Sequence, residues 1–127
     1  MEDHSKEPLS IEVVGRATSS VAPSVLEDYA HHRLQFALRR FRDYVRRVTL
    51  RLTDENGPRR GVDTRCVIAV ELTHGTPIVV EATTPWPTAS VTAAAHRLSE
   101  AVRRRFDREH GRSRRSARRG AGVHAAA

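Results

Sequence analysis

Apolar residues alternate with polar ones along three segments of the chain. Val48, Leu50 and Leu52 are separated by single polar residues, which is typical of a strand with one buried face. The same period of two predicts a second strand over Cys66–Leu72 and a third over Ile78–Ala82. Polar loops rich in turn-forming residues separate these segments, so the three strands are predicted to form an antiparallel meander.

Two other segments show the helical spacing of three to four residues between apolar positions. In the first, which follows Pro23, these positions are Leu26, Tyr29, Ala30, Leu34, Ala37, Leu38 and Phe41. In the second, which Trp86-Pro87-Thr88 opens, they are Val91, Ala94, Ala95, Leu98, Ala101, Val102 and Phe106. A short apolar run over Ile11–Gly15 precedes the first helix and predicts an opening strand.

The predicted order of elements is β-α-β-β-β-α, which belongs to the α+β class. Two amphipathic helices need one apolar sheet face, so we expect a two-layer sandwich with both helices on one face of a four-stranded sheet. The other face lacks a matching apolar set and is expected to meet water, because it carries Thr49, Arg51, Arg65, Glu71 and Glu81. Residues 1–10 are predicted to be a flexible N-terminus, 11–110 the folded domain, and 111–127 a disordered basic tail.

The charge of the chain favours a polyanionic partner. Its formal net charge is +7, and 21 of its 22 positive residues are arginine. Arginine grips phosphate oxygens with a planar fork of donors. A GC-rich coding sequence could also explain arginine in place of lysine, but it does not explain the excess of positive over negative charge.

Membrane insertion and a disulfide framework are not expected. The chain has one cysteine, no signal-like N-terminal stretch and no apolar run of about 18 residues. These features predict a cytoplasmic location.

No set of residues predicts catalysis or metal binding. His31 and His32 are adjacent on a predicted helix and so do not face one another. Cys66 alternates with core residues and is predicted to be a small buried hydrophobe. Asp54 and Asp63 flank a Gly/Pro-containing loop, where turn formation explains them. We therefore expect a protein that is not an enzyme and that has no cofactor, no metal ion and no small-molecule substrate.

The distribution of arginine favours backbone contacts with folded RNA over reading of single strands. The predicted strands carry no aromatic residue on which bases could stack, and the loop from Gly57 to Gly61 is one residue longer than a KH-type clamp. Two arginine-bearing helices, an arginine-bearing loop and a basic tail remain, and residues 97–119 hold ten arginines against three acids. A charged helix face that is merely solvated is the alternative for either helix alone.

The loop sequence is similar to that of a known family. Residues 56–66 read Asn-Gly-Pro-Arg-Arg-Gly-Val-Asp-Thr-Arg-Cys, which resembles the Asn-Gly-Pro-Arg-Gly-Gly-x-Asp-Lys-x-Cys segment of the HPF/RaiA family of ribosome hibernation and ribosome-associated inhibitor proteins. Arg33-Leu34 and the segment 94–98 match the family's Lys-Leu and Ala-x-Asp-Lys-Leu stretches. The resemblance covers the family's N-terminal domain, over roughly residues 11–110 of this chain.

The resemblance implies a factor that binds ribosomal RNA of the small subunit, on 30S or 70S particles. Such a factor inhibits translation and promotes hibernation under stress by steric occupation, and it is expected to be monomeric off the ribosome. Arg33 and Arg97 match basic positions of the family, and helical geometry and the loop extend the set. The predicted RNA-binding residues are Arg33, Arg39, Arg40, Arg59, Arg60, Arg97, Arg104 and Arg108.

Some positions depart from the family pattern. Thr88–Thr92 stands where the family has Tyr-Ala-Ala-Ile-Asp, Arg60 replaces a glycine and Thr64 replaces a lysine. The second domain through which long members pair ribosomes is not expected in a chain of this length. Two other hypotheses stay open: an RNA- or DNA-binding module of the same fold with a non-ribosomal target, and an interaction domain whose basic faces meet an acidic protein.

Overall fold

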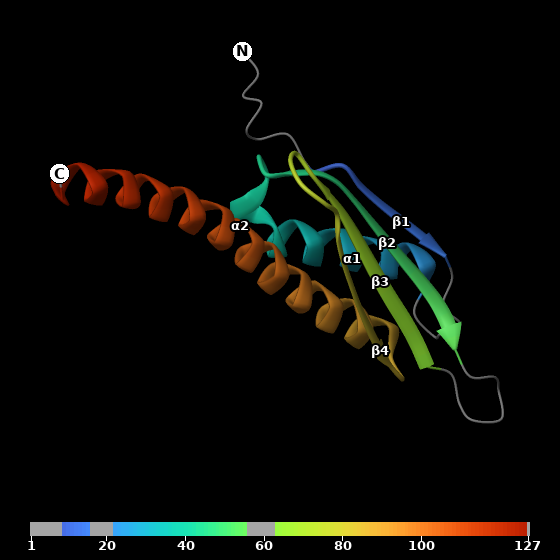
Figure 1. Cartoon of the computed structure of the whole chain (residues 1–127). Helices are drawn as coiled ribbons and strands as arrows, with labels where there is room; N and C mark the ends of the chain where they lie inside the picture. Colours follow the sequence, from blue (N-terminus) through green and yellow to red (C-terminus); the bar gives the residue numbers. More distant parts are fainter. Residues whose placement is uncertain (1–8, 16–21, 56–62, 127) are drawn as a thin grey trace, which may run out of the picture.

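A computed structural model describes residues 9–15, 22–55 and 63–126 of the chain, with side chains as far as Gly111. The elements follow the predicted order (Figure 1). They are β1 (Ile11–Gly15), α1 (Pro23–Ala37), the 3-10 helix η2 (Arg39–Phe41), β2 (Val45–Glu55), β3 (Asp63–Leu72), β4 (Ile78–Thr84) and α2 (Pro87–Ala126).

The four strands form one mixed sheet in the order β1-β2-β3-β4. The predicted antiparallel meander is confirmed, since β3 pairs antiparallel with both β2 and β4. Strand β1 adds to it in parallel, with Ile11 opposite Val48. The loop between β2 and β3, which contains Arg59 and Arg60, lies outside the described residues.

The end of β1 requires glycine. Gly15 has a φ of 93°, a conformation that side chains other than glycine's rarely adopt. A Cβ atom there would lie 2.1 Å from the Leu52 carbonyl oxygen of β2. The chain can therefore leave the sheet at this close approach only because residue 15 has no side chain.

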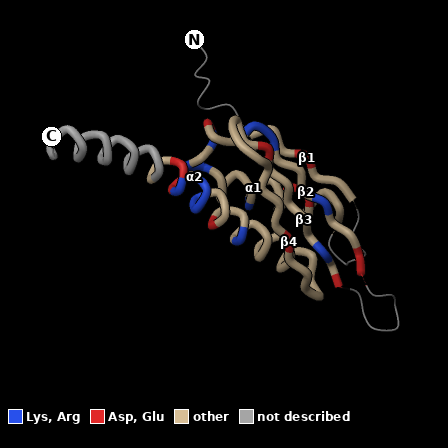
Figure 2. Tube along the Cα trace, viewed as in Figure 1, with Lys and Arg blue, Asp and Glu red and all other residues tan. Residues whose placement is uncertain are grey.

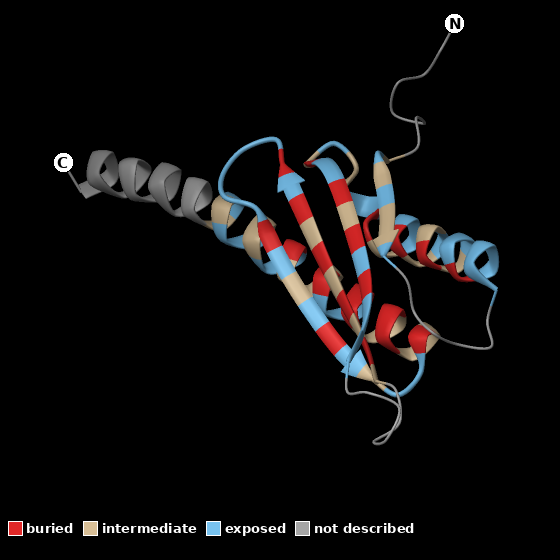
Figure 3. Ribbon diagram, turned by 90° about the vertical axis from the view of Figure 1, so that its right-hand side faces the viewer, coloured by how far each residue is buried: buried red, intermediate tan, exposed pale blue. Residues whose placement is uncertain are grey.

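Both helices pack on the same face of the sheet, as predicted (Figure 1). The side chains between the layers are fully buried Leu34 and Leu38 from the first helical segment, Leu50 and Ile68 from the sheet, and Leu98 from α2. Burial alternates along the strands, and the opposite face of the sheet is uncovered (Figure 3). The apolar residues of the strands, with a period of two, and those of the helices, with a period of 3.6, thus pack into one shared core.

The first helix ends earlier than predicted. Its α-helical part stops at Ala37, and Arg39 and Arg40 lie in η2, so the expectation that they continue the face of α1 is wrong in this detail. Leu38 leaves the helical conformation, with φ −109° and ψ 11°. The tighter turn keeps Leu38 buried and turns Phe41 toward the core, because apolar contacts decide the path of the backbone here.

The last helix continues where a disordered tail was predicted. Helix α2 spans Pro87–Ala126, so its backbone is helical across residues 111–126. Arginine and alanine are good helix formers, and extending an existing helix needs no new nucleus. Side chains beyond Gly111 lie outside the described residues, so the contacts predicted for the basic tail stay a prediction.

Candidate nucleic-acid interface

The residues that the sequence analysis weighed for catalysis or metal binding do not form a reactive centre. Cys66 is fully buried in β3, and burial raises the pKa of its thiol to about 12. Its predicted role as a small buried hydrophobe is confirmed. The exposed His32 ring is hydrogen-bonded to the Asp28 carbonyl of its own helix. Among the described residues no group of His, Cys, Asp or Glu could hold a metal ion, and no helix is long and apolar enough to span a membrane.

An aromatic cluster joins η2 and the start of β2 to α2. The Phe106 ring of α2 packs on Phe41, with centroids 5.3 Å apart, and edge-on against Tyr44 at 5.5 Å. His110 stacks on Phe106, with ring centroids 3.8 Å apart. The Tyr44 hydroxyl donates a hydrogen bond to Glu109. These contacts bring residues more than 60 positions apart in the sequence to one end of the domain.

The same cluster brings two runs of arginine together. Residues 39–47 hold five arginines and one aspartate, and α2 adds more where it passes η2 (Figure 2). We define the basic end as Arg39, Arg40, Arg42, Arg46, Arg47, Arg103, Arg104 and Arg108. Within the part of the chain that the structure describes, no hydrogen bond or ion pair engages Arg40, Arg46, Arg103, Arg104 or Arg108, and all five are exposed.

A β-bulge contributes to the basic end. The register between β2 and β3 shifts between Val45 and Arg47, where Val45 pairs with Leu72 and Arg47 with the preceding Glu71. The extra residue is Arg46, and both Arg46 and Arg47 are exposed. Bulges commonly re-aim a side chain in this way. No period-two pattern could have found Arg46, although the density of arginine in residues 39–47 is visible in the sequence.

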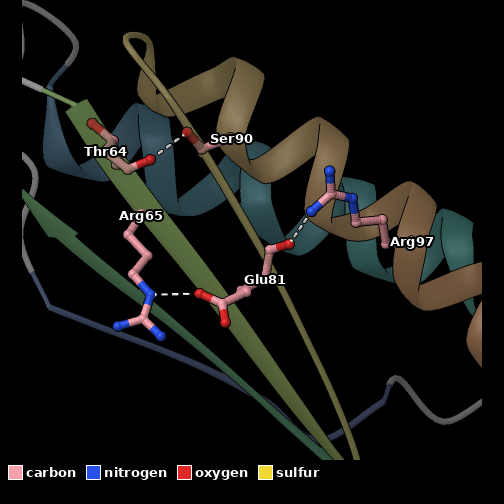
Figure 4. A network of polar contacts seen from close by, with 5 residues as sticks. All are labelled: Thr64, Arg65, Glu81, Ser90 and Arg97. Carbon is pink, nitrogen blue, oxygen red and sulfur yellow. Dashed lines mark hydrogen bonds and ion pairs between the residues drawn. The ribbon is translucent and has the colours of Figure 1, made fainter.

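Two other arginines of α2 donate hydrogen bonds to backbone carbonyls at the edge of the sheet. Strand β4 is an edge of the sheet, and Arg97 donates a hydrogen bond to its Glu81 carbonyl (Figure 4). Arg105 donates to the carbonyl of Thr76, which precedes β4, at 2.8 Å. We call Arg97 and Arg105 the β4-edge arginines. Sequence periodicity places Arg97 with Arg104 but does not show that its guanidinium satisfies an edge carbonyl.

The predicted arginines lie on two flanks of the helical layer. Arg97, Arg104 and Arg108 are seven and four residues apart and so form one row on α2, on the side toward β4. On α1, Arg33 follows Tyr29 by four residues, and the Tyr29 hydroxyl is hydrogen-bonded to Thr92 of α2. Arg33 therefore lies on the side of α1 that faces α2.

Burial also differs among these arginines. Arg39, Arg40, Arg97, Arg104 and Arg108 are exposed. The predicted residue Arg33 is half-buried, and its Nε is buried without a hydrogen-bond partner in the part of the chain that is described.

The altered start of α2 is held by a network of hydroxyl groups (Figure 4). The Ser90 hydroxyl donates to the Thr64 carbonyl at 2.6 Å and lies 2.8 Å from the Thr84 hydroxyl. Thr64, where the family resemblance expects lysine, is buried in β3. A long charged side chain at this buried position would carry a large desolvation cost, so threonine here belongs to the packing between the sheet and α2.

The open face of the sheet mixes both signs of charge. Arg65 donates to Glu81 at 2.7 Å, and this pairing lowers the pKa of the Glu81 carboxyl. Glu71 is also exposed on this side, opposite Arg47. Positive charge on the open face, that of Arg47 included, is therefore accompanied by acids.

Known structures share this two-layer arrangement. A ribosomal subunit interface protein from Coxiella burnetii has a TM-score of 0.59 at 16% identity, over 77% of this chain and 98% of that chain. The N-terminal domain of Protein Y from Thermus thermophilus has a TM-score of 0.53 at 20% identity, again over 77% and 98%. No protein-family model and no curated protein matches the chain. At these identities the likeness shows the fold, and it confirms the HPF/RaiA-like fold that the loop sequence implied.

Proposed function

We propose that this protein is a ribosome-associated factor that binds ribosomal RNA of the small subunit and inhibits translation by steric occupation. The proposal includes a cytoplasmic location, a role in hibernation under stress and a monomeric state off the ribosome. No chemical step is required. One protein of the same fold is named as a ribosomal subunit interface protein, and this name supports the choice of the ribosome among possible RNA targets.

The observation that carries the proposal is the basic end. All of its arginines except Arg42 are exposed, and residues 39–47 contain a single acid, which suits phosphate oxygens spaced along a folded RNA. Arg46 and Arg103 join the proposed RNA-binding set because both are exposed at this end. The set predicted from the sequence, Arg33, Arg39, Arg40, Arg59, Arg60, Arg97, Arg104 and Arg108, remains part of the proposal.

Sedimentation tests the proposal directly. Tagged protein in lysate from stationary-phase cells is expected to comigrate with 30S or 70S particles at low salt and to be released when salt is moderately raised. Release follows because phosphate contacts are exchanged for counterions. RNase treatment of a parallel pull-down should remove the captured partner. A protein that stays at the top of the low-salt gradient contradicts a ribosomal role, and equal affinity for unrelated duplexes and ribosomes favours a general nucleic-acid module.

A further inference from the structure

Phe36 is an exposed aromatic ring with an arginine on one of its faces. The residue is 58% exposed at the C-terminal end of α1, whereas Leu26, Ala30 and Leu34 of the same helix are buried. The central carbon of the Arg39 guanidinium lies 4.1 Å from the centroid of the Phe36 ring. Arg39 also donates a hydrogen bond of 2.8 Å to the Phe36 carbonyl. The hydrogen bond holds the guanidinium over the ring, so the two groups form one preorganised stack.

Helical spacing indicates on which side of each helix this stack and the nearby arginines lie. Phe36 follows Tyr29 by seven residues, or about two turns, and so lies on the side of α1 toward α2, together with Arg33. On α2, Arg103 follows Thr92 by eleven residues, or about three turns, and lies on the side toward α1. The exposed ring and Arg103 therefore lie on the facing sides of the two helices.

We propose that the Phe36–Arg39 stack binds an unpaired nucleobase of RNA, while Arg33, Arg40 and Arg103 contact the phosphates beside it. The inference rests on the proposed function and deepens it, because it names the state of the RNA that is bound. Phosphate contacts position a protein on RNA without distinguishing paired from unpaired bases. Stacking on an aromatic ring requires a base that has left the helix, and it tolerates any base because each has a π face.

A single exposed phenylalanine is an ordinary surface feature. Phe36 differs from the other exposed large hydrophobic residues, Val25, Val79 and Trp86, because among the described residues it alone carries an arginine on its ring. Arg39 on the ring and Arg33 on the same side of α1 carry charge opposite to that of an RNA backbone. The strands carry no aromatic residue, so the helical layer supplies the stacking surface that the sheet lacks.

Three variants separate stacking from general apolar contact. Phe36→Leu keeps an apolar side chain but removes the π face, Phe36→Trp keeps and enlarges it, and Val25→Ala is a control on the same helix, at a residue that is also 58% exposed. Each protein is titrated with a single-stranded RNA and with a fully paired duplex carrying the same number of phosphates. Each is also sedimented with 30S subunits.

We expect Phe36→Leu to weaken single-strand binding by about fivefold to a hundredfold while duplex binding stays unchanged. Phe36→Trp and Val25→Ala should bind both RNAs like the wild type. Equal binding of the wild type and Phe36→Leu to single strands overturns the inference, as does a wild type that binds neither RNA. The inference is also overturned if Phe36→Leu binds like the wild type and Phe36→Trp binds less well. That order indicates that Phe36 fits an apolar pocket of a protein partner.

The failures of the two proposals are distinguishable. If the wild type prefers single strands through Phe36 but does not sediment with 30S subunits, the ribosomal proposal fails and the stacking inference stands. If the wild type sediments with 30S subunits and Phe36→Leu matches it on both RNAs, stacking fails and the ribosomal proposal stands.

Discussion

Arg97 and Arg104 lie two turns apart on the same side of α2, yet their surroundings differ. Arg97 is exposed, but its guanidinium donates to the Glu81 carbonyl at the edge of the sheet. Arg104 is also exposed, at the basic end, and no described residue pairs with it. The comparison shows that two exposed arginines of equal charge are not equivalent, because Arg97 has a hydrogen-bond partner and Arg104 has none among the described residues.

The engaged arginine has a structural task. An edge strand presents unpaired backbone groups to which another strand could pair. Arg97 and Arg105 satisfy carbonyls on and just before β4, and so they shield that edge. Arg97 keeps further N–H donors for phosphate, but moving its guanidinium toward RNA would give up the contact with β4. Its expected share of RNA binding is therefore smaller than that of Arg104.

The largest expected effect comes from reversing charge at the basic end. The double variant Arg104→Glu/Arg108→Glu should weaken binding to 30S subunits by about a hundredfold or more, because charge-assisted contacts contribute about 1.5–3 kcal/mol each. The slope of log affinity against log salt should fall by about two. Both are measured by filter binding across a salt series.

The matched control for this prediction is Arg51→Glu, an exposed arginine on the open face of the sheet. A single variant, Arg104→Glu, changes the net charge by the same amount as Arg51→Glu and allows a direct comparison. If the two weaken binding equally, overall charge rather than the basic end governs association.

A smaller effect is expected from Arg97→Gln, and it falls on stability. Loss of the hydrogen bond to β4 should lower the free energy of unfolding by about 0.5–1.5 kcal/mol, discounted toward the low end because Arg97 is exposed. Arg104→Gln should change it by less than about 0.5 kcal/mol. Urea unfolding of Arg97→Gln and Arg104→Gln measures both free energies. Identical unfolding midpoints would show that the contact of Arg97 with β4 contributes nothing to stability.

The smallest expected effect concerns Tyr44, whose hydroxyl donates a hydrogen bond to Glu109. Partial burial, followed by this hydrogen bond, raises the pKa of Tyr44 from 10.0 to about 12. A folded-state pKa above the unfolded value means that the stabilisation is fully present below about pH 10 and is lost as the pH rises toward about 12. Tyr44→Phe should therefore be less stable than the wild type at neutral pH, with the difference narrowing in that window.

Unfolding of the wild type and Tyr44→Phe at neutral pH and across pH 10 to 12 measures this difference. Glu109→Gln is the companion variant, since it keeps an acceptor oxygen but removes the charge. A constant difference between wild type and Tyr44→Phe at all pH values would contradict the assignment of the raised pKa to the folded state.

The arrangement of elements was predictable because it depends on periodicity. The alternation through Val48, Leu50 and Leu52 and the helical spacing through Leu98 and Val102 each require one buried face, and a single sheet face satisfies all of them. Periodicity failed where tertiary contacts compete with local preference. It continued α1 through Arg39 and Arg40, whereas the packing of Leu38 and Phe41 turns the chain into η2.

The candidate site was predictable in part. Exposure of Arg39, Arg40, Arg97, Arg104 and Arg108 follows from their positions opposite or beside apolar faces, and the described residues confirm that exposure. Their grouping could not be predicted, because it depends on how Phe106 packs against Phe41 and Tyr44 across a large sequence separation. The role of Arg46 could not be predicted either, since a bulge has no signature in a period-two pattern.

The amino-acid sequence by itself determined the class of fold, the buried faces and the excess of arginine, since these depend on local spacing and composition. Only the tertiary structure decided which arginines are available to a partner. Hydrogen bonds to carbonyls on and just before β4 engage Arg97 and Arg105, while the aromatic cluster gathers the arginines of η2, β2 and α2 at one end. The physical reason is that availability depends on what lies within hydrogen-bonding distance, and chain folding alone sets those distances.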